Sequence, residues 1–375
     1  MEHLLSPFIN RFIRSGRAFA LYRLPHRAPL TLMMDPEGAI PLSALQNLHE
    51  RVGFVVSPFR WTDRCPLLLI RPDIYAVGEE AIYDILRHML QAEENSTGQD
   101  NNTAKAASMP HFPTSNEAPL YRYKYSFERF MAQLQQGRCS KLVLSRKADI
   151  GREDECNLAA SFFQALAAYP HAMVALFHTP ATGTWLTCSP ELFAEGSEND
   201  WRTLSLAGTM WPETHLPEQG AWSEKNRREQ ELVTTFFEER FAQLSVPYTK
   251  EACKTIAAGE LLHLATYFSF HLSSPECIWP ILSSLYPTPA ICGTPQREAF
   301  DVICEQEGYE RGYYSGLIGP KTMDKTSLYV NLRCMQATGG RLYLYAGGGL
   351  LPSSTLEKEW LETQKKMETI RRILL

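Results

Sequence analysis

Short apolar segments separated by turn residues recur along this 375-residue chain, and they constrain its fold more than any other feature. Within the first 90 residues, the strand-like segments are AFALYRLP, LTLMM, VGFVVSPF and PLLLIRP, with a few short helices between them. Helical patterns such as YAVGEEAIYDILRHMLQA interrupt them without regular strand–helix alternation. The pattern predicts the α+β class rather than a doubly wound parallel sheet.

A polar stretch from residue 93 to 108 divides the chain, because ENSTGQDNNTAKAAS contains almost no bulky apolar side chain. Such a composition is typical of a loop. We expect residues 1–110 to form a less informative N-terminal part of one α/β fold. Residues 111–375 are expected to carry the functional site.

Composition excludes several classes of function. A net charge of −5 argues against a dedicated nucleic-acid binder, and the nine cysteines lack metal-ligand spacing, which predicts reduced thiols. The first residues do not resemble a signal peptide, and no stretch is apolar enough to span a bilayer. We expect a soluble cytoplasmic protein that binds neither nucleic acid nor membranes.

Beyond the polar stretch, the patterns predict helices in FERFMAQLQQG, NLAASFFQALAAYP, EKNRREQELVTTFFEERFAQL and QREAFDVICEQEG. Strands are predicted in SKLVLSRKADI, MVALFHT, TWLTCSPELFAEG and TLSLAGT, whereas ELLHLATYFSFHL fits either type. The C-terminal end reads as two strands, SLYVNLRCMQA and RLYLYAGGGLL, followed by the helix EKEWLETQKKMETI.

This C-terminal run concentrates groups that bind anions and hard metals. Arg333 lies within an apolar strand pattern and needs either an internal acid or a ligand carboxylate held by its two-pronged guanidinium. The triplet 347–349 leaves backbone amides open to an anion. Spacings of three, four and seven residues place Glu359, Glu362 and Lys366 on one helix face.

Acids on two helices suggest a magnesium site. Glu229 and Glu231 lie in one helix, and Glu359 and Glu362 in the other. Magnesium keeps several waters and usually takes one or two protein carboxylates, so one acid from each helix would suffice. The alternative is solvated surface charge, which is the commoner state of any single glutamate.

Three other side chains are candidates for proton transfer. Lys141 opens a strand and can act as a base only if its surroundings lower its pKa; the alternative is an exposed strand-end lysine. Glu191, in a turn between strands, can act as an acid if burial raises its pKa; the alternative is a turn acid. His263 is by default a semi-buried structural histidine.

Taken together and in order, these stretches resemble the chorismate-utilising enzymes, which include isochorismate, salicylate, anthranilate and aminodeoxychorismate synthases. The resemblance covers about residues 120 to 370. It is carried by SKLVLSR, TCSPELF, LAGT, EKNRREQELV, HLAT, LYPTPAICGTP, ERGYYSGLIG, LRC, LYLYAGGGL and EKEWLETQKK. It implies a large sandwich of antiparallel sheets with surrounding helices, like anthranilate synthase component I, and an active site in the central cleft.

The resemblance also implies roles for individual residues. Magnesium would be held by Glu229 and Glu362, with Glu359 in its outer shell, and Asn226 replaces a further acid that related helices often carry. Lys141 would be the base and Glu191 the acid. The chorismate-binding residues implied by the match are Gly208, Thr209, His263, Thr294, Tyr314, Arg333, Gly347, Gly348, Gly349 and Lys366.

Lysine at position 141 is typical of the family members that add water, whereas members that add ammonia generally lack it. The resemblance therefore favours a magnesium-dependent isochorismate synthase that feeds menaquinone or siderophore synthesis. The alternatives are a salicylate synthase, which would go on to eliminate pyruvate, and a non-catalytic chorismate-binding subunit. No glutaminase subunit is expected, and a monomer is the default.

Overall fold

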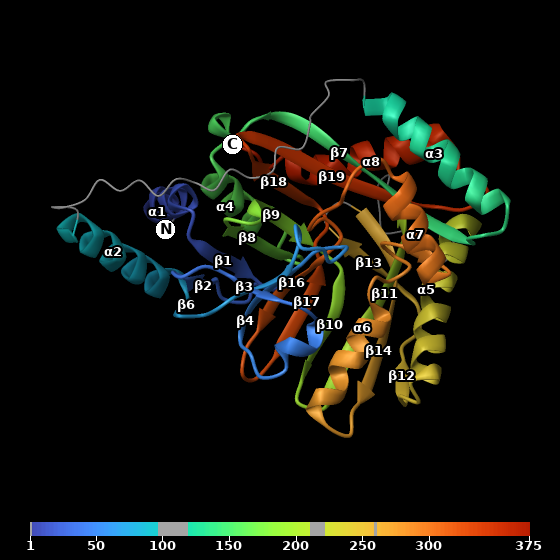
Figure 1. Cartoon of the computed structure of the whole chain (residues 1–375), viewed down its shortest axis with the longest axis horizontal. Helices are drawn as coiled ribbons and strands as arrows, with labels where there is room; N and C mark the ends of the chain where they lie inside the picture. The colour runs from blue at the N-terminus through green and yellow to red at the C-terminus, as the bar shows by residue number, and fades with distance from the viewer. Residues whose placement is uncertain (1, 97–118, 211–221, 259–260) are drawn as a thin grey trace.

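The computed structural model describes residues 2–96, 119–210, 222–258 and 261–375. Two antiparallel sheets pack face to face (Figure 1). Sheet A contains, in spatial order, β15 (Gly293–Thr294), β7 (Lys141–Arg152), β19 (Arg341–Leu350), β18 (Cys334–Thr338), β9 (Gly183–Ser189), β8 (Met173–Thr179), β1 (Ala18–Arg23), β2 (Thr31–Asp35) and β6 (Ile74–Val77).

Sheet B contains, in spatial order, β12 (Tyr248–Lys250), β14 (Leu261–His271), β11 (Asp200–Met210), β10 (Leu192–Ser197), β17 (Thr326–Val330), β16 (Leu317–Lys321), β4 (Gly53–Ser57), β5 (Leu67–Ile70) and β3 (Ile40–Leu42), while β13 (Lys254–Ala258) pairs with β14. Strands from the first 90 residues thus belong to both sheets.

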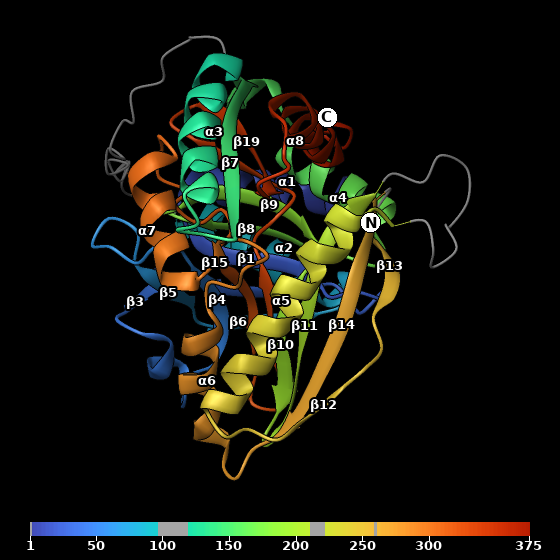
Figure 2. The same cartoon turned by 90° about the vertical axis from the view of Figure 1, so that its right-hand side faces the viewer.

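Helices cover both outer faces of the sandwich. The outer face of sheet A packs against α1 (Glu2–Ser15), α2 (Glu79–Ser96), α4 (Leu158–Ala168) and the end of α8 (Leu356–Arg371). The outer face of sheet B packs against α5 (Glu224–Gln243) and α6 (Ile278–Leu285); Figure 2 shows α5 running along β11 and β14. A further cluster joins α3 (Pro119–Gln135) and α7 (Gln296–Gln306) to β7.

The predicted α+β sandwich of antiparallel sheets is confirmed, with differences in individual elements. The strand patterns of the first residues did not reveal α1, and α2 continues to Ser96, into the stretch predicted as a loop. The remainder of that stretch, from residue 97, lies outside the described residues. The ambiguous segment at 261–271 is a strand, β14. No described helix is long and apolar enough to cross a membrane.

One predicted strand, SLYVNLRCMQA, is wrong. The chain leaves β17 of sheet B at Val330 and enters β18 of sheet A at Cys334, so Arg333 lies in the crossing between two strands. Arg333 has a φ of 49°, a left-handed conformation that an L-residue adopts at a cost. Apolar neighbours on both sides concealed the break from pattern analysis.

A second crossing runs beside the first. The chain passes from β9 of sheet A to β10 of sheet B through Pro190 and Glu191. The two crossings are hydrogen-bonded: Val330 N donates to Glu191 O at 3.0 Å, and Cys188 N donates to Arg333 O at 3.0 Å. The fold therefore brings Glu191 and Arg333 together between the sheets, although 142 residues separate them in the sequence.

Candidate active site

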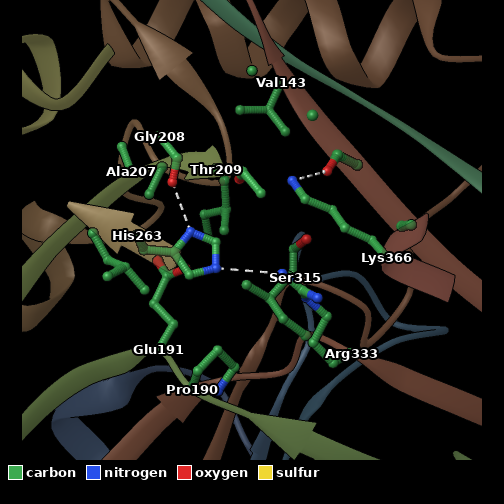
Figure 3. Close-up of a pocket in the computed structure, with 18 of the residues that line it drawn as sticks. Val143, Pro190, Glu191, Ala207, Gly208, Thr209, His263, Ser315, Arg333 and Lys366 are labelled. Carbon is green, nitrogen blue, oxygen red and sulfur yellow. Dashed lines mark hydrogen bonds between the residues drawn. The ribbon is translucent and has the colours of Figure 1, made fainter. Parts of the chain in front are cut away.

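A cavity lies between the sheets where the two crossings meet β11, β14, β19, α5 and α8 (Figure 3). Most of the residues predicted to bind ligand line it: Glu191, Gly208, Thr209, Glu229, His263, Tyr314, Arg333, Gly347, Gly348, Gly349 and Lys366. Sequence reasoning missed the neutral part of the lining: Val143, Pro190, Leu206, Ala207, Ala290, Ile291, Ser315, Leu332, Tyr345 and Ala346.

Arg333 supplies a buried positive charge to this cavity. Its Nη1 donates to Thr369 Oγ1 at 3.2 Å, and its Nη2 lies 3.4 Å from His263 Nε2. Burial lowers the pKa of the guanidinium to about 10, so it stays charged at neutral pH. Among the described residues no carboxylate forms an ion pair with it, which leaves the charge available to an anionic ligand.

His263 orients this arginine rather than transferring protons. Its Nδ1 lies 2.7 Å from Gly208 O, and a carbonyl oxygen only accepts, so Nδ1 carries the proton. Nε2 is then free to accept from Arg333. Burial and the nearby charges of Arg333 and Lys366 lower the pKa of His263 to about 3, which keeps the ring neutral.

The glycine triplet forms a bare backbone surface along one side of the site. It lies inside β19, which continues to Leu350 and agrees with the predicted strand RLYLYAGGGLL. A Cβ added at Gly349 would lie 2.1 Å from Glu229 Oε1, and one at Gly348 would lie 3.2 Å from Glu359 Oε2. Larger residues here would displace the carboxylates. Lys366 anchors α8 to this surface, since its Nζ donates to Gly347 O at 2.9 Å.

Lys141 is fully buried rather than an exposed strand-end lysine. It is the first residue of β7, and its Nζ lies 3.0 Å from Glu229 Oε1. Its stem also lies beside the triplet, because a Cβ at Gly349 would be 3.0 Å from Lys141 Cε. A long side chain that ends in an amine is thereby held next to the cavity by one carboxylate.

Glu191 enters the cavity from the first crossing. Its side chain is buried, and this burial raises its pKa to about 7 against the opposing effects of Lys141, Lys366 and Arg333. A carboxyl with this pKa is partly protonated at neutral pH, so Glu191 can donate a proton.

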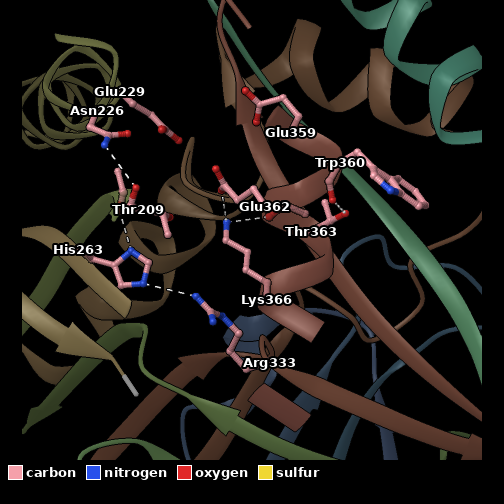
Figure 4. Close-up of polar contacts among 12 residues, drawn as sticks. Thr209, Asn226, Glu229, His263, Arg333, Glu359, Trp360, Glu362, Thr363 and Lys366 are labelled. Atoms are coloured by element: carbon pink, nitrogen blue, oxygen red, sulfur yellow. Dashed lines mark hydrogen bonds and ion pairs between the residues drawn. The ribbon is translucent and has the colours of Figure 1, made fainter. Parts of the chain in front are cut away.

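Three carboxylates from two helices gather around the triplet, each with a lysine partner. Glu229 of α5 pairs with Lys141, whereas Glu359 and Glu362 of α8 pair with Lys225 and Lys366. Figure 4 shows the three glutamates on facing helices. Burial of Glu362 opposes its ionisation, but the contact with Lys366 helps to outweigh this effect and lowers its pKa.

These carboxylates fit a magnesium ion. Glu359 Oε2 is buried without a hydrogen-bond partner, and both it and Glu362 Oε1 lie close to Gly348, where no side chain intervenes. Within the described ranges no group of three or more acidic, histidine or cysteine residues forms a ready metal cage. A site with one or two protein carboxylates, completed by water and ligand oxygens, suits magnesium.

Asn226 stands where an acid was expected from related helices. Its Nδ2 donates to Thr209 O at 3.3 Å, so it joins the start of α5 to the cavity lining. The Ser223 hydroxyl accepts from Asn226 N and caps the same helix.

Two predicted candidates lie elsewhere. Thr294 belongs to β15, pairs with Lys141 in the ladder, and does not line the cavity. Glu231 does not line the cavity and forms an exposed ion pair with Arg228.

Sequence reasoning also missed a buried ion pair, Glu307–Arg311, behind β7. Glu307 Oε1 accepts from Ser145 N at 2.7 Å, and Arg311 Nη2 donates to Val143 O at 2.8 Å. The pair satisfies backbone groups of β7 beyond its short pairing with β15. In the sequence, this ion pair was indicated by the i,i+4 spacing of Glu307 and Arg311, where Arg311 is the second residue of ERGYYSGLIG.

The fold and the cavity define a two-sheet antiparallel sandwich with a charged cavity between its sheets, beside acidic helices. The chain belongs to the family described as chorismate binding enzyme, whose model matches residues 55–375.

Two curated relatives are isochorismate synthases. The vibriobactin-specific enzyme of Vibrio cholerae is 28% identical over 66% of this chain and 65% of its own length. Isochorismate synthase EntC of Escherichia coli K12 is 31% identical over 61% of each chain. The match therefore spans less than two thirds of either relative.

Solved structures share the fold at low sequence identity. Menaquinone-specific isochorismate synthase MenF of Escherichia coli aligns with a TM-score of 0.73 and 19% identity, covering 95% of this chain and 88% of MenF. Anthranilate synthase component I of Streptococcus pneumoniae aligns with a TM-score of 0.61 and 16% identity, covering 94% and 92%. The fold predicted from the sequence is therefore confirmed.

Proposed function

We propose that this protein is an isochorismate synthase, which converts chorismate to isochorismate by adding water at C2 and releasing the C4 hydroxyl. The observation that carries the proposal is the combination of fully buried Lys141 with buried Glu191, whose pKa is raised to about 7. A base and an acid beside one cavity suit a reaction that removes one proton and supplies another.

Chorismate is a dicarboxylate, and the cavity suits such a ligand. Arg333 has no acidic partner among the described residues, and neutral His263 and Thr369 hold it in place. One carboxylate of the substrate would pair with the guanidinium in a bidentate arrangement. The backbone of the triplet and Tyr314 would contact the rest of the molecule.

In the proposed reaction, Lys141 in its neutral form removes a proton from the water that attacks C2. Glu191 in its acid form protonates the C4 hydroxyl, which leaves as water. One water enters and one leaves, so the substrate is isomerised. Magnesium, held by Glu229 and Glu362 with Glu359 in the outer shell, would supply positive charge for a substrate carboxylate.

Two alternatives differ in outcome. A salicylate synthase would eliminate pyruvate from isochorismate in the same cavity, and a non-catalytic subunit would bind chorismate unchanged. The presence of both proton-transfer groups disfavours the second alternative. Lysine at position 141 favours water over ammonia, so no glutaminase subunit is proposed, and we propose a cytoplasmic monomer. The product would feed menaquinone or siderophore synthesis.

The decisive experiment incubates purified protein with chorismate and magnesium chloride and separates the products by chromatography. Isochorismate is expected. Salicylate with an equal amount of pyruvate would replace the proposal with the lyase, and anthranilate formed with ammonia would reject it. Binding without conversion, measured by calorimetry, would indicate the non-catalytic subunit.

A further inference from the structure

Among the described residues, three lysines pair with the acidic cluster of Glu229, Glu359 and Glu362. Of these, Lys141 transfers a proton in the proposed reaction and Lys366 lines the cavity, whereas Lys225 does neither. It lies in the first turn of α5, and its Nζ is 2.5 Å from Glu359 Oε1 of α8. This ion pair therefore bridges the two helices that carry the proposed magnesium ligands, Glu229 and Glu362.

The charge of Lys225 acts on the whole acidic cluster. Burial alone would lower its pKa, but attraction from Glu359, and then from Glu229 and Glu362, outweighs burial and raises it. The lysine thus carries its positive charge at neutral pH within electrostatic range of all three carboxylates.

The two partners differ in their freedom to move. Glu359 is 1% exposed and is fixed against β19, where its second oxygen, Oε2, lacks a partner near Gly348. The Lys225 side chain is 29% exposed and has a path to solvent. If a divalent cation enters, Lys225 can withdraw, whereas the carboxylate stays.

We propose that Lys225 is a displaceable counter-ion, which neutralises Glu359 while the metal is absent and competes with magnesium for the acidic cluster. The inference rests on the magnesium site of the proposed function. It assigns Lys225 the role of setting magnesium affinity: the lysine keeps binding weak until the cation displaces it.

If Lys225 has this role, removing it should change the magnesium affinity in the opposite direction to removing a carboxylate that binds the metal. Removing the charge in Lys225→Met leaves Glu359 buried without its counter-ion and strengthens attraction for a divalent cation. Because interactions between partly buried charges a few ångströms apart are strong, magnesium should bind at least about ten-fold more tightly. If the ion pair between Lys225 and Glu359 only held α5 and α8 together, its loss would instead weaken magnesium binding.

The test is a calorimetric titration of magnesium chloride into substrate-free protein, which needs no catalytic activity. Lys225→Met should lower the Kd at least about ten-fold, whereas Lys225→Arg, which keeps the charge, should match the wild type. Lys358→Met is the matched control, because Lys358 is an exposed lysine of α8 next to Glu359 in sequence. It should change the Kd less than about two-fold.

The outcomes separate the two proposals. If the wild type binds magnesium and Lys225→Met binds it equally or more weakly, the counter-ion role is overturned while the metal site stands. Equal tightening by Lys225→Arg or Lys358→Met would also overturn it. If neither the wild type nor Lys225→Met binds magnesium, the magnesium site itself is rejected, and the counter-ion role with it. Circular dichroism shows whether Lys225→Met folds. If it does not fold while Lys225→Arg binds magnesium normally, Lys225→Gln replaces it in the test. Lys225→Gln must then lower the Kd for magnesium at least about ten-fold.

Discussion

The space between the two sheets has a packed half and a cavity half. In the packed half, Tyr22, Phe54 and Phe177 from β1, β4 and β8 fill the interlayer with aromatic contacts. In the cavity half, Glu191 and Arg333 enter from the crossings, and helix lysines and glutamates surround them. One sandwich architecture thus supports either an apolar core or a charged site.

The difference shows how the fold tolerates buried charge. Apolar contacts in the packed half stabilise the sandwich, whereas every buried ion in the cavity half carries a desolvation cost that its partners must offset. We expect substitutions in the cavity half to change chemistry more than stability, and substitutions in the packed half to do the reverse. The following experiments test this separation, beginning with the largest expected effect.

The strongest test of the cavity half removes a proposed metal ligand. Glu362→Ala should reduce isochorismate formation to background at every magnesium concentration, because one of two protein carboxylates is lost. Initial rates over a magnesium titration measure the effect. Glu357→Ala, at an exposed position of the same helix, should retain wild-type rates. Full activity of Glu362→Ala at low magnesium would contradict the ligand assignment.

Loss of either proton-transfer group should be the next largest effect. Lys141→Ala and Glu191→Gln are each expected to lower kcat by about 10²–10⁴-fold while chorismate still binds, since a lost acid or base has this effect. Stopped assays measure kcat, and calorimetry measures chorismate binding. A near-normal kcat in either variant would reject its role.

The pH profile provides an independent check on Glu191. Its acid form is the active one, so kcat/KM should fall as pH rises through the pKa of about 7. Glu191→Gln cannot ionise and should lose this falling limb. A limb that persists in Glu191→Gln belongs to another group.

The sequence revealed the charged residues of the cavity half better than it revealed their surroundings. Glu191, Glu229, Arg333 and Lys366 were predicted from separate segments, and the fold brings them to one cavity. The burial of Lys141 was not readable, because its covering residues in β15 and β19 lie about 150 and 200 residues further on. Local patterns cannot report contacts made across such separations.

Arg333 shows a second limit. Its apolar neighbours fit one continuous strand, but those neighbours belong to two sheets, and the left-handed backbone at Arg333 depends on the adjacent crossing. Likewise, α1 lacked a recognisable start in a stretch read as strands with short helices. Contacts between segments that are distant in the sequence, rather than local patterns, determined the conformation of the Arg333 segment and of α1.

In the packed half, Phe54→Ala should change stability and leave chemistry intact. Phe54 is fully buried and packs against Tyr22 and Phe177. The cavity left behind should lower the free energy of unfolding by about 3–5 kcal/mol, measured by urea denaturation. Activity per folded molecule should stay within about two-fold of the wild type, and Phe54→Leu should show a smaller loss of stability. A large fall in kcat with normal stability would mean that the two halves are coupled.

The smallest expected effect lies at the edge of sheet A, at Thr294 of β15. The family resemblance assigns it to the substrate, yet its hydroxyl is buried without a hydrogen-bond partner and it does not line the cavity. Thr294→Val removes no hydrogen bond, so KM for chorismate should change less than about two-fold. Thr209→Val, at a residue that does line the cavity, is the comparison and should raise KM more. A rise of about ten-fold in Thr294→Val alone would show that β15 moves toward the substrate when chorismate binds, which would extend the cavity half to the edge of sheet A.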